Sequence, residues 1–181
     1  MRVVVISGSP RRNANTETMM RYVYEYAMDR NGGDGSATTF VNLSEGQVEC
    51  FHGFDVEYGE ATKSAAKAIT EADVWLVGTP IYNSFFSSAL KNLFEYIDYK
   101  KTPGKTAGMA VMAASSIGFT DVQTVLTQLM SYFGVVTNPK AVFMTTGDVA
   151  DGAISSADAQ ARLREMVDGT LEMASKLAQN R

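Results

Sequence analysis

The hydrophobic residues of this chain change period repeatedly along its length. Short runs that are apolar throughout alternate with longer segments in which apolar residues recur every three or four positions, the patterns of buried strands and of the helices that cover them. The runs predict strands over residues 3–6, 38–41, 74–77, 106–112 and 141–144. The longer segments predict helices over residues 16–30, 61–72, 87–98, 120–133 and 156–178. Because strands that are apolar on both faces need cover on both sides, this alternation predicts a doubly wound α/β fold around a parallel sheet.

The chain is long enough to bury one sizeable core. It has 181 residues, of which 45% are hydrophobic, and shows no internal repeat or linker, so we expect a single domain over residues 1–181. The stretch 44–60 lacks a regular pattern and contains Cys50 and His52; we expect a surface loop there. Doubly wound sheets bind ligands at the carboxyl ends of their strands, which directs attention to the loops after the first, third and fourth predicted strands.

Charge and cysteine content exclude several classes of function. Sixteen basic and twenty acidic residues give a net charge of −4, which disfavours binding to nucleic acid or to an anionic membrane. The single cysteine, Cys50, excludes an intramolecular disulfide framework, a zinc site with several thiolates and an all-cysteine iron–sulfur cluster. No apolar run approaches the ~20 residues of a membrane span, and the start of the chain is too short for a signal-peptide core. We therefore expect a cytoplasmic protein with no metal site.

The loop after the first predicted strand has the composition of an anion site. Residues 7–16 read SGSPRRNANT and lead into a helix, whose first backbone N–H groups lack partners. Arg11 and Arg12 lie beside the positive end of that helix, where cations are unfavourable unless an anion lies between them. This favours a phosphate site. The alternative is a plain turn in which Asn15 caps the helix and both arginines are solvated.

Other phosphate and nucleophile motifs do not fit. Gly104-Lys105-Thr106 copies the end of a Walker A loop, but Tyr99 stands where the first glycine is required and the triplet precedes a strand, so we expect a turn. No Gly-x-Gly-x-x-Gly follows a strand, and the first loop has no cysteine for a thiol phosphatase. Ser9 as a nucleophile would need a base, and the single histidine, His52, lies in the irregular stretch.

The loops after the third and fourth predicted strands suit a flat ring. Residues 78–86 read GTPIYNSFF and offer an apolar face edged by hydrogen-bonding groups. The alternative is that Ile81, Tyr82, Phe85 and Phe86 are core or dimer contacts. Residues 113–119 read AASSIGF, and their small side chains allow the backbone to approach a ligand closely.

Two paired motifs resemble the NAD(P)H-dependent FMN reductases of the flavodoxin-like fold. The motifs are Gly8-Ser9-Pro10-Arg11 with Asn15-Thr16, and Gly78-Thr79-Pro80-Ile81-Tyr82 with Leu90-Lys91-Asn92. The resemblance covers nearly the whole chain and implies a five-stranded parallel sheet of order 2-1-3-4-5 with helices on both faces. It implies that the FMN phosphate contacts Ser9, Arg11, Asn13, Asn15 and Thr16. It implies that the flavin ring lies against Pro80, Ile81, Tyr82, Asn83 and Ser84, with its edge closed by Ser115, Ser116 and Gly118.

The resemblance also implies an activity. NAD(P)H would pass a hydride to FMN, and the reduced FMN would reduce a second acceptor such as free flavin, a quinone, an azo compound or a metal oxyanion. No catalytic acid or base is required. The helix that starts at Ser87 resembles the family's dimer contact, so we expect a homodimer or homotetramer, with a flavin-dependent monooxygenase as a candidate partner. The alternatives are a flavodoxin-like electron carrier without turnover and a module that has lost its ligand.

The sequence departs from the family pattern at five positions. Ala14 replaces a frequent serine or glycine, Phe85 replaces a frequent serine, and Ser88 replaces a frequent glycine. Ser115 and Ser116 stand where a pair of glycines is common. These departures affect one phosphate contact, the face that receives the second substrate and the edge of the ring.

Overall fold

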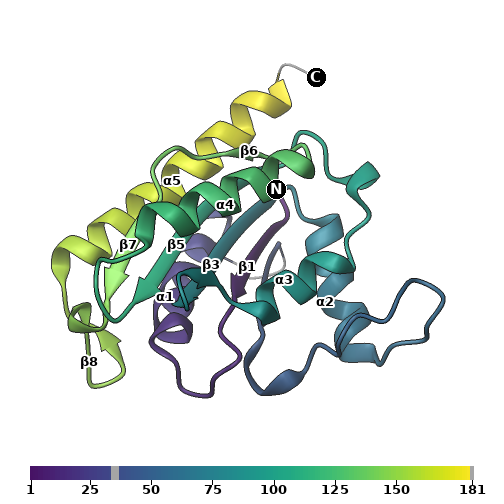
Figure 1. Ribbon diagram of the computed structural model, residues 1–181. Coiled ribbons are helices and arrows are strands. Elements are labelled where there is room, and N and C mark those ends of the chain that lie inside the picture. Colours follow the sequence, from purple (N-terminus) through teal and green to yellow (C-terminus); the bar gives the residue numbers. More distant parts are fainter. Residues whose placement is uncertain (34–36, 180–181) are drawn as a thin grey trace.

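The computed structural model describes residues 1–33 and 37–179, and it consists of a twisted sheet between two layers of helices (Figure 1). The strands are β1 (Val3–Ser7), β2 (Thr38–Asn42), β3 (Val74–Tyr82), β4 (Phe85–Phe86), β5 (Thr106–Ala113), β6 (Val136–Thr137), β7 (Val142–Thr145), β8 (Val149–Ala150) and β9 (Ala153–Ile154). The helices are α1 (Asn15–Arg30), α2 (Glu60–Glu71), α3 (Ser88–Glu95), α4 (Phe119–Tyr132) and α5 (Ala157–Gln179). Short 3-10 turns cover Ser44–Gly46, Tyr99–Lys101 and Thr146–Asp148.

The parallel strands follow the expected flavodoxin-like order. β1 pairs with β2 on one side and β3 on the other, and β5 pairs with β3. β6 and β7 pair with successive parts of β5 and together take the place of the fifth strand. Between them lies Pro139, which has no amide hydrogen to donate to a ladder. The order 2-1-3-4-5 over five parallel positions is therefore confirmed.

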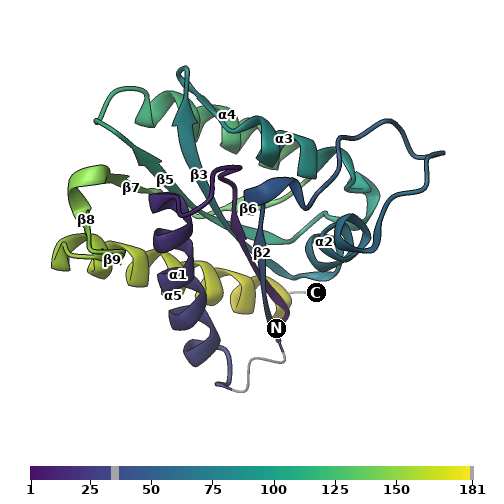
Figure 2. The same cartoon turned by 90° about the horizontal axis from the view of Figure 1, so that it is seen from below.

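Each face of the sheet has its own apolar layer. On one face, Val3, Val5 and Leu76 pack beneath α1 and α5, which lie side by side in Figure 2. On the other face, Ile6 and Trp75 pack beneath α2, α3 and α4. Alternate residues of β1 enter opposite layers because side chains of a strand point alternately up and down. Every residue of β1 and of β5 is buried.

Two predicted boundaries were wrong, and one pair of strands was missed. β3 continues beyond residue 77 to Tyr82, because β5 still pairs with Thr79 and Pro80 after β1 has ended opposite Gly78. The segment 78–82 is thus strand, and a hairpin follows in which β4 pairs with Ile81 and Tyr82. α3 ends at Glu95 instead of residue 98. The hairpin of β8 and β9 was not predicted at all.

Two other sequence predictions are confirmed. The stretch 44–60 is irregular up to residue 59, apart from a single 3-10 turn at its start, and α2 begins at Glu60. Gly104 lies in a turn, and the Lys105 ammonium donates to the carbonyls of Thr70 and Ala72 at the end of α2, where a helix favours a cation. The triplet 104–106 is therefore a structural turn that leads into β5 at Thr106. Among the described helices, none combines the length and the apolar character needed to cross a membrane.

The backbones of β1 and β3 approach each other closely just beyond the end of β1. The Gly8 amide donates to the Gly78 carbonyl across 2.8 Å. A Cβ on residue 8 would lie 2.6 Å from that same oxygen and 3.3 Å from the Leu90 Cβ. Glycine is therefore required at this position for β1 and β3 to meet as they do.

We expect Gly8→Ala to lower the free energy of unfolding by about 1–3 kcal/mol, because the added methyl group must displace backbone. Chemical denaturation measures this value. Gly147→Ala is the matched control, since its Cβ would meet only the Thr145 hydroxyl at 3.6 Å. If both variants unfold at the wild-type denaturant concentration, the close approach does not constrain the sheet.

Candidate functional site

A cavity of about 330 Å³ opens at the carboxyl end of the sheet. It lies where β1 and β3 diverge, the position at which doubly wound sheets bind ligands. Its walls come from the loop after β1, the end of β3, the end of β5 and the segment after β7. The lining residues are Arg11, Asn13, Ala14, Asn15, Thr16, Pro80, Ile81, Tyr82, Met112, Ala113, Ala114 and Thr146.

Contacts of the Ser9 hydroxyl hold the loop after β1 in place. The buried Ser9 hydroxyl accepts the Arg11 amide at 3.2 Å and lies 3.3 Å from the Tyr82 hydroxyl. Ser9 is not among the lining residues. Its hydroxyl instead connects the first loop to the end of β3. Asn13 adopts a left-handed conformation, with φ of 50°, which asparagine tolerates better than most residues.

The amino terminus of α1 faces the cavity without a side-chain cap. The N-cap position is Ala14, which has no side-chain acceptor, and Asn15 is the first helical residue. The alternative in which Asn15 caps the helix is therefore wrong. The start of the helix carries a partial positive charge and free N–H groups, and the exposed Arg11 lies beside it. An anion in the cavity would satisfy both.

The end of β3 forms an apolar wall. Pro80, Ile81 and Tyr82 line the cavity opposite the helix start. The two residues that follow, Asn83 and Ser84, have φ of 48° and 65°, as expected of a two-residue type I′ hairpin turn. Both are exposed at the tip of the hairpin and do not line the cavity. The wall therefore offers flat apolar surface from a regular strand rather than from a loop.

The loop after β5 lines the cavity with other residues than the sequence predicts. Ala113 and Ala114 line the cavity, whereas Ser115 and Ser116 are exposed and lie outside its lining. Gly118, at φ of 84°, is the N-cap of α4; a Cβ there would lie 3.8 Å from the Ile81 Cδ1. Gly118 therefore lies next to Ile81 of the apolar wall but outside the cavity lining.

Several lining residues were not predicted. Met112 lies in the predicted fourth strand but was not assigned to a site. Thr146 follows β7 in a 3-10 turn, where Thr145 and Asp148 form a capping box. The rule that ligands bind at the ends of strands, applied to the fifth strand as well, would have pointed to this segment. Ala14 was noticed in the sequence only as a departure from the family pattern.

The site is suited to binding rather than to acid–base catalysis. Among the lining residues, all of which lie in the described part of the chain, Arg11 and Tyr82 are the titratable ones. No group of three or more His, Cys, Asp or Glu side chains that could hold a metal occurs within residues 1–33 and 37–179. A molecule with an anionic end and a flat apolar part matches this distribution of groups.

Ser87 forms hydrogen bonds that hold together the elements next to the cavity. Its fully buried hydroxyl donates to the Gly8 carbonyl and, as the N-cap of α3, accepts the Leu90 amide at 3.1 Å. Its own amide donates to the Thr79 hydroxyl at 3.1 Å. One residue thus joins the end of β1, β3 and the start of α3. A serine immediately before a helix is the usual N-cap signal, but its bond to Gly8 is not readable from sequence.

We expect Ser87→Ala to lower the free energy of unfolding by about 1–3 kcal/mol, because the buried Gly8 carbonyl and Leu90 amide each lose a partner. The neighbouring Ser88 is exposed, and Ser88→Ala is expected to stay within about 0.5 kcal/mol of wild type. Equilibrium denaturation compares the two. Equal stability of both variants would show that the Ser87 network does not hold the loop.

The sequence matches a family model described as NADPH-dependent FMN reductase over residues 1–150. An NADH-dependent FMN reductase of Pseudomonas fluorescens is 33% identical over 98 residues, which are 54% of this chain and 52% of that protein. The chain thus spans about half the length of the first curated relatives it matches. An NADPH azoreductase of a Bacillus species is 27% identical over 170 residues, with 92% and 89% of the two chains covered.

Solved structures agree in fold. The flavoenzyme NAD(P)H:acceptor oxidoreductase FerB of Paracoccus denitrificans superposes with a TM-score of 0.74 at 22% identity, over 97% of each chain. At this level of identity the likeness shows the fold alone. The family model, by contrast, covers most of the sequence and includes both paired motifs. The chain belongs to the NADPH-dependent FMN reductase family.

Proposed function

We propose that residues 1–181 form one FMN-binding domain of an NAD(P)H-dependent flavin oxidoreductase. The observation that carries the proposal is the uncapped start of α1, with Arg11 beside it, opposite the apolar wall of Pro80, Ile81 and Tyr82. FMN has a phosphate at one end and a flat ring system at the other. The cavity has complementary groups in the same relation, so the residues present fit this cofactor.

The phosphate is assigned to the start of α1. Arg11 supplies a charge-assisted hydrogen bond, and Asn13, Asn15 and Thr16 supply polar groups around it. The Ser9 hydroxyl takes a supporting role, because it already accepts the Arg11 amide and lies against the Tyr82 hydroxyl. Ser9 therefore sets the spacing between the phosphate loop and the wall that receives the ring.

The ring is assigned to the wall of β3. Pro80, Ile81 and Tyr82 present apolar and aromatic surface to one side of it. Asn83 and Ser84 continue the chain directly beyond this wall, and Ser115 and Ser116 directly beyond Ala114. We assign these exposed polar residues, with Gly118, to the edge of the ring, where the second substrate enters.

When bound, FMN would supply the redox chemistry, taking up a hydride from NAD(P)H and reducing a second acceptor. The chain's own residues hold and orient the ring and supply no proton-transfer group, in agreement with a lining whose titratable residues are Arg11 and Tyr82. The names of the relatives, flavin reductases and an azoreductase, support free flavin and azo compounds as acceptors, with quinones and metal oxyanions as further candidates. A flavin-dependent monooxygenase is the proposed consumer of reduced flavin.

We expect Arg11→Ala to weaken FMN binding about tenfold to 150-fold, since a charge-assisted hydrogen bond contributes roughly 1.5–3 kcal/mol. Riboflavin carries the same ring without the phosphate, so its affinity is expected to be nearly unchanged. Titration of flavin fluorescence measures both values. Arg164→Ala, an exposed arginine of α5 outside the cavity lining, is the control. Equal losses for FMN and riboflavin would remove Arg11 from the phosphate site.

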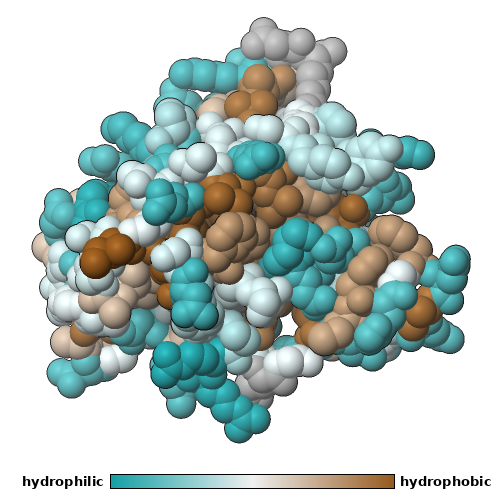
Figure 3. All heavy atoms as spheres, in the orientation of Figure 1, coloured by the Kyte–Doolittle hydropathy of each residue, from teal (hydrophilic) through white to brown (hydrophobic). Residues whose placement is uncertain are grey.

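We also infer a homodimer formed through the face of α3 and α4, with a tetramer as a pair of such dimers. Apolar atoms gather between these two helices on the molecular surface (Figure 3). Large side chains are exposed around them: Phe54 by 75%, Phe85 by 48%, Tyr99 by 50% and Tyr132 by 66%. Patches of this kind mark association surfaces.

The irregular stretch 44–60 packs against this face. The Asn92 side chain donates to the Glu49 carbonyl at 2.7 Å and accepts the Phe51 amide at 2.8 Å. Tyr96 also donates to the Glu49 carbonyl, at 2.8 Å, and burial together with Tyr58 raises the pKa of Tyr96 to about 12. The phenol therefore stays protonated and able to donate to the Glu49 carbonyl at physiological pH. The exposed Cys50 in this segment fits the reducing cytoplasm that we infer as its location.

We expect light scattering to give twice the 19.6 kDa of one chain. Tyr132→Glu is expected to shift the mass towards the monomer, because a charge would have to be buried at the interface. Ser175→Glu adds the same charge on α5, on the opposite face of the sheet, and is expected to leave the mass unchanged. A wild-type protein that stays monomeric at micromolar concentration would contradict the inferred dimer.

A further inference from the structure

Thr146 brings a polar side chain into the cavity from the fifth strand position of the sheet. It follows β7 directly and lines the cavity. The neighbouring wall at the end of β5 consists of Met112, Ala113 and Ala114, whose side chains are apolar. Among the lining residues, all of which lie in the described part of the chain, the other polar side chains come from residues 11–16 and from Tyr82. On this side of the cavity the Thr146 hydroxyl is therefore the polar side-chain group.

The Thr146 hydroxyl is available to a bound molecule. It makes no hydrogen bond with any residue of the described ranges 1–33 and 37–179, and Thr146 is exposed. The hydroxyl of the preceding residue, Thr145, differs because it donates to the Asp148 carboxylate at 3.2 Å. A hydroxyl without an internal partner can both donate to and accept from a ligand.

The turn that carries Thr146 is fixed on both sides. Before the turn, Thr145 pairs with Ala113 of β5. Within the turn, the Asp148 carboxylate also accepts the Thr145 amide, at 2.8 Å. After the turn, the Asp148 carbonyl accepts the Ser155 amide at 2.9 Å, which connects the turn to the base of the β8–β9 hairpin. Asp148 thus sets the position from which Thr146 lines the cavity.

Thr146 belongs to neither of the two ends that the proposed function assigns to FMN. The phosphate is assigned to the start of α1 and the ring to the wall of residues 80–82, and in FMN a hydroxylated ribityl chain joins them. We propose that the Thr146 hydroxyl forms a hydrogen bond with this ribityl chain, and that Asp148 is the positioning residue that holds Thr146 in place. The inference rests on the proposed function, because it assumes that the cavity holds FMN in this direction.

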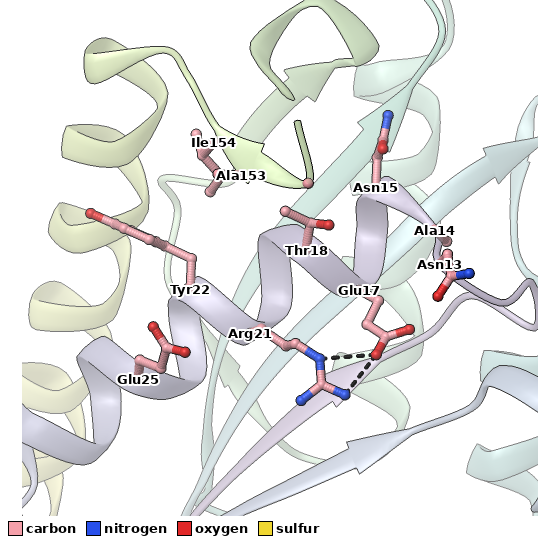
Figure 4. Close-up of a pocket in the computed structure, with 11 residues that line it drawn as sticks. Asn13, Ala14, Asn15, Glu17, Thr18, Arg21, Tyr22, Glu25, Ala153 and Ile154 are labelled. Carbon is pink, nitrogen blue, oxygen red and sulfur yellow. Dashed lines mark hydrogen bonds and ion pairs between the residues drawn. The ribbon is translucent and has the colours of Figure 1, made fainter. Parts of the chain in front are cut away.

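A second and larger hollow, of about 670 Å³, offers the flavin a different course. Residues 13–15 line both spaces, so the two meet at the start of α1. From there the second hollow runs beside α1, where Thr18 and Tyr22 project towards Ala153 and Ile154 of the β8–β9 hairpin (Figure 4).

The charges of the second hollow do not suit the flavin ring. Glu17, Arg21 and Glu25 line it, and the Arg21 guanidinium is paired with Glu17 at 2.7 and 2.9 Å. An apolar ring laid over these groups would remove their water without supplying hydrogen-bond partners. It would also leave the apolar wall of residues 80–82 uncovered. The course past Thr146 is therefore favoured.

Three flavins separate the parts of the cofactor in a binding experiment. FMN has the ring, the ribityl chain and the phosphate; riboflavin lacks the phosphate; lumiflavin has a methyl group in place of the ribityl chain. Thr146→Val removes the hydroxyl and keeps the shape of the side chain. Thr18→Val is the matched control, because Thr18 lines the second hollow and not the cavity. Flavin fluorescence gives the dissociation constant of each flavin for wild type and each variant.

We expect Thr146→Val to weaken FMN and riboflavin by the same factor, about three- to tenfold, the size of one neutral hydrogen bond. Lumiflavin is expected to stay within about twofold of wild type, and Thr18→Val to change no flavin. The proposal is overturned if riboflavin is unaffected by Thr146→Val, if lumiflavin is weakened as strongly as FMN, or if Thr18→Val produces the losses instead. Failure of wild type to bind FMN would contradict the proposed function itself.

The role of Asp148 is tested in the same titrations. Asp148→Ala removes the acceptor of Thr145 and is expected to weaken FMN and riboflavin but not lumiflavin. Asp148→Asn keeps an oxygen that accepts the Thr145 amide and is expected to retain most of the affinity. In the Thr146→Val background, Asp148→Ala is expected to add no further loss. A further loss of riboflavin affinity there would show that Asp148 does not act through Thr146.

Discussion

The contact between Gly8 and Gly78 sets the geometry on which the rest of the structure depends. β1 and β3 run together as far as Ser7 and Gly78, and the Gly8 amide closes the pair with a bond of 2.8 Å to the Gly78 carbonyl. Beyond this point the chain of β1 turns away into α1, whereas β3 continues beside β5. The cavity is the space that this divergence leaves. A larger residue at position 8 would push the two strand ends apart and change the walls on both sides.

The two faces of the sheet carry different features on either side of the Gly8–Gly78 contact. α1 and the β8–β9 hairpin border the second hollow, on the face that is packed by Val5 and Leu76. α3, α4 and the irregular segment form the aromatic face on the opposite side of the sheet. The second hollow therefore lies away from the surface that a second subunit would cover. The proposed cofactor site lies at the carboxyl end of the sheet, between these two faces.

The fold was predictable because its pattern repeats and each run is strongly apolar. The strand order followed only from the resemblance, since periodicity does not specify which strands are neighbours. The error in β3 has a physical cause. Pro80 indicates a break in most strands, but here β1 has already ended at Ser7, so β3 beyond Gly78 keeps only one parallel neighbour. The β8–β9 hairpin was missed although its turn, Asp151-Gly152, is the strongest short hairpin signal and has φ of 51° and 74°.

The sequence predicted which segments form the candidate site, but not which of their side chains line the cavity. Seven of the expected residues line the cavity, namely Arg11, Asn13, Asn15, Thr16, Pro80, Ile81 and Tyr82. Ser9 instead faces Tyr82, a contact between positions 73 residues apart that no local pattern contains. The orientation of Ser115 and Ser116 away from the cavity depends on where β5 ends and how α4 begins at Gly118. Such choices are made by tertiary packing rather than by local propensity.

The central position of β1 also affects the order in which the chain can fold. Val3 pairs with Thr38 on one side but with Val74 on the other. During synthesis at about 5–20 residues per second, the third strand therefore reaches the first only about 4–14 s after it. Until then one edge of the apolar run 3–6 has no native neighbour, and such edges are prone to pairing between chains. A fold that places its first strand at the centre of a parallel sheet thus leaves one apolar edge of that strand without its native neighbour for several seconds of synthesis.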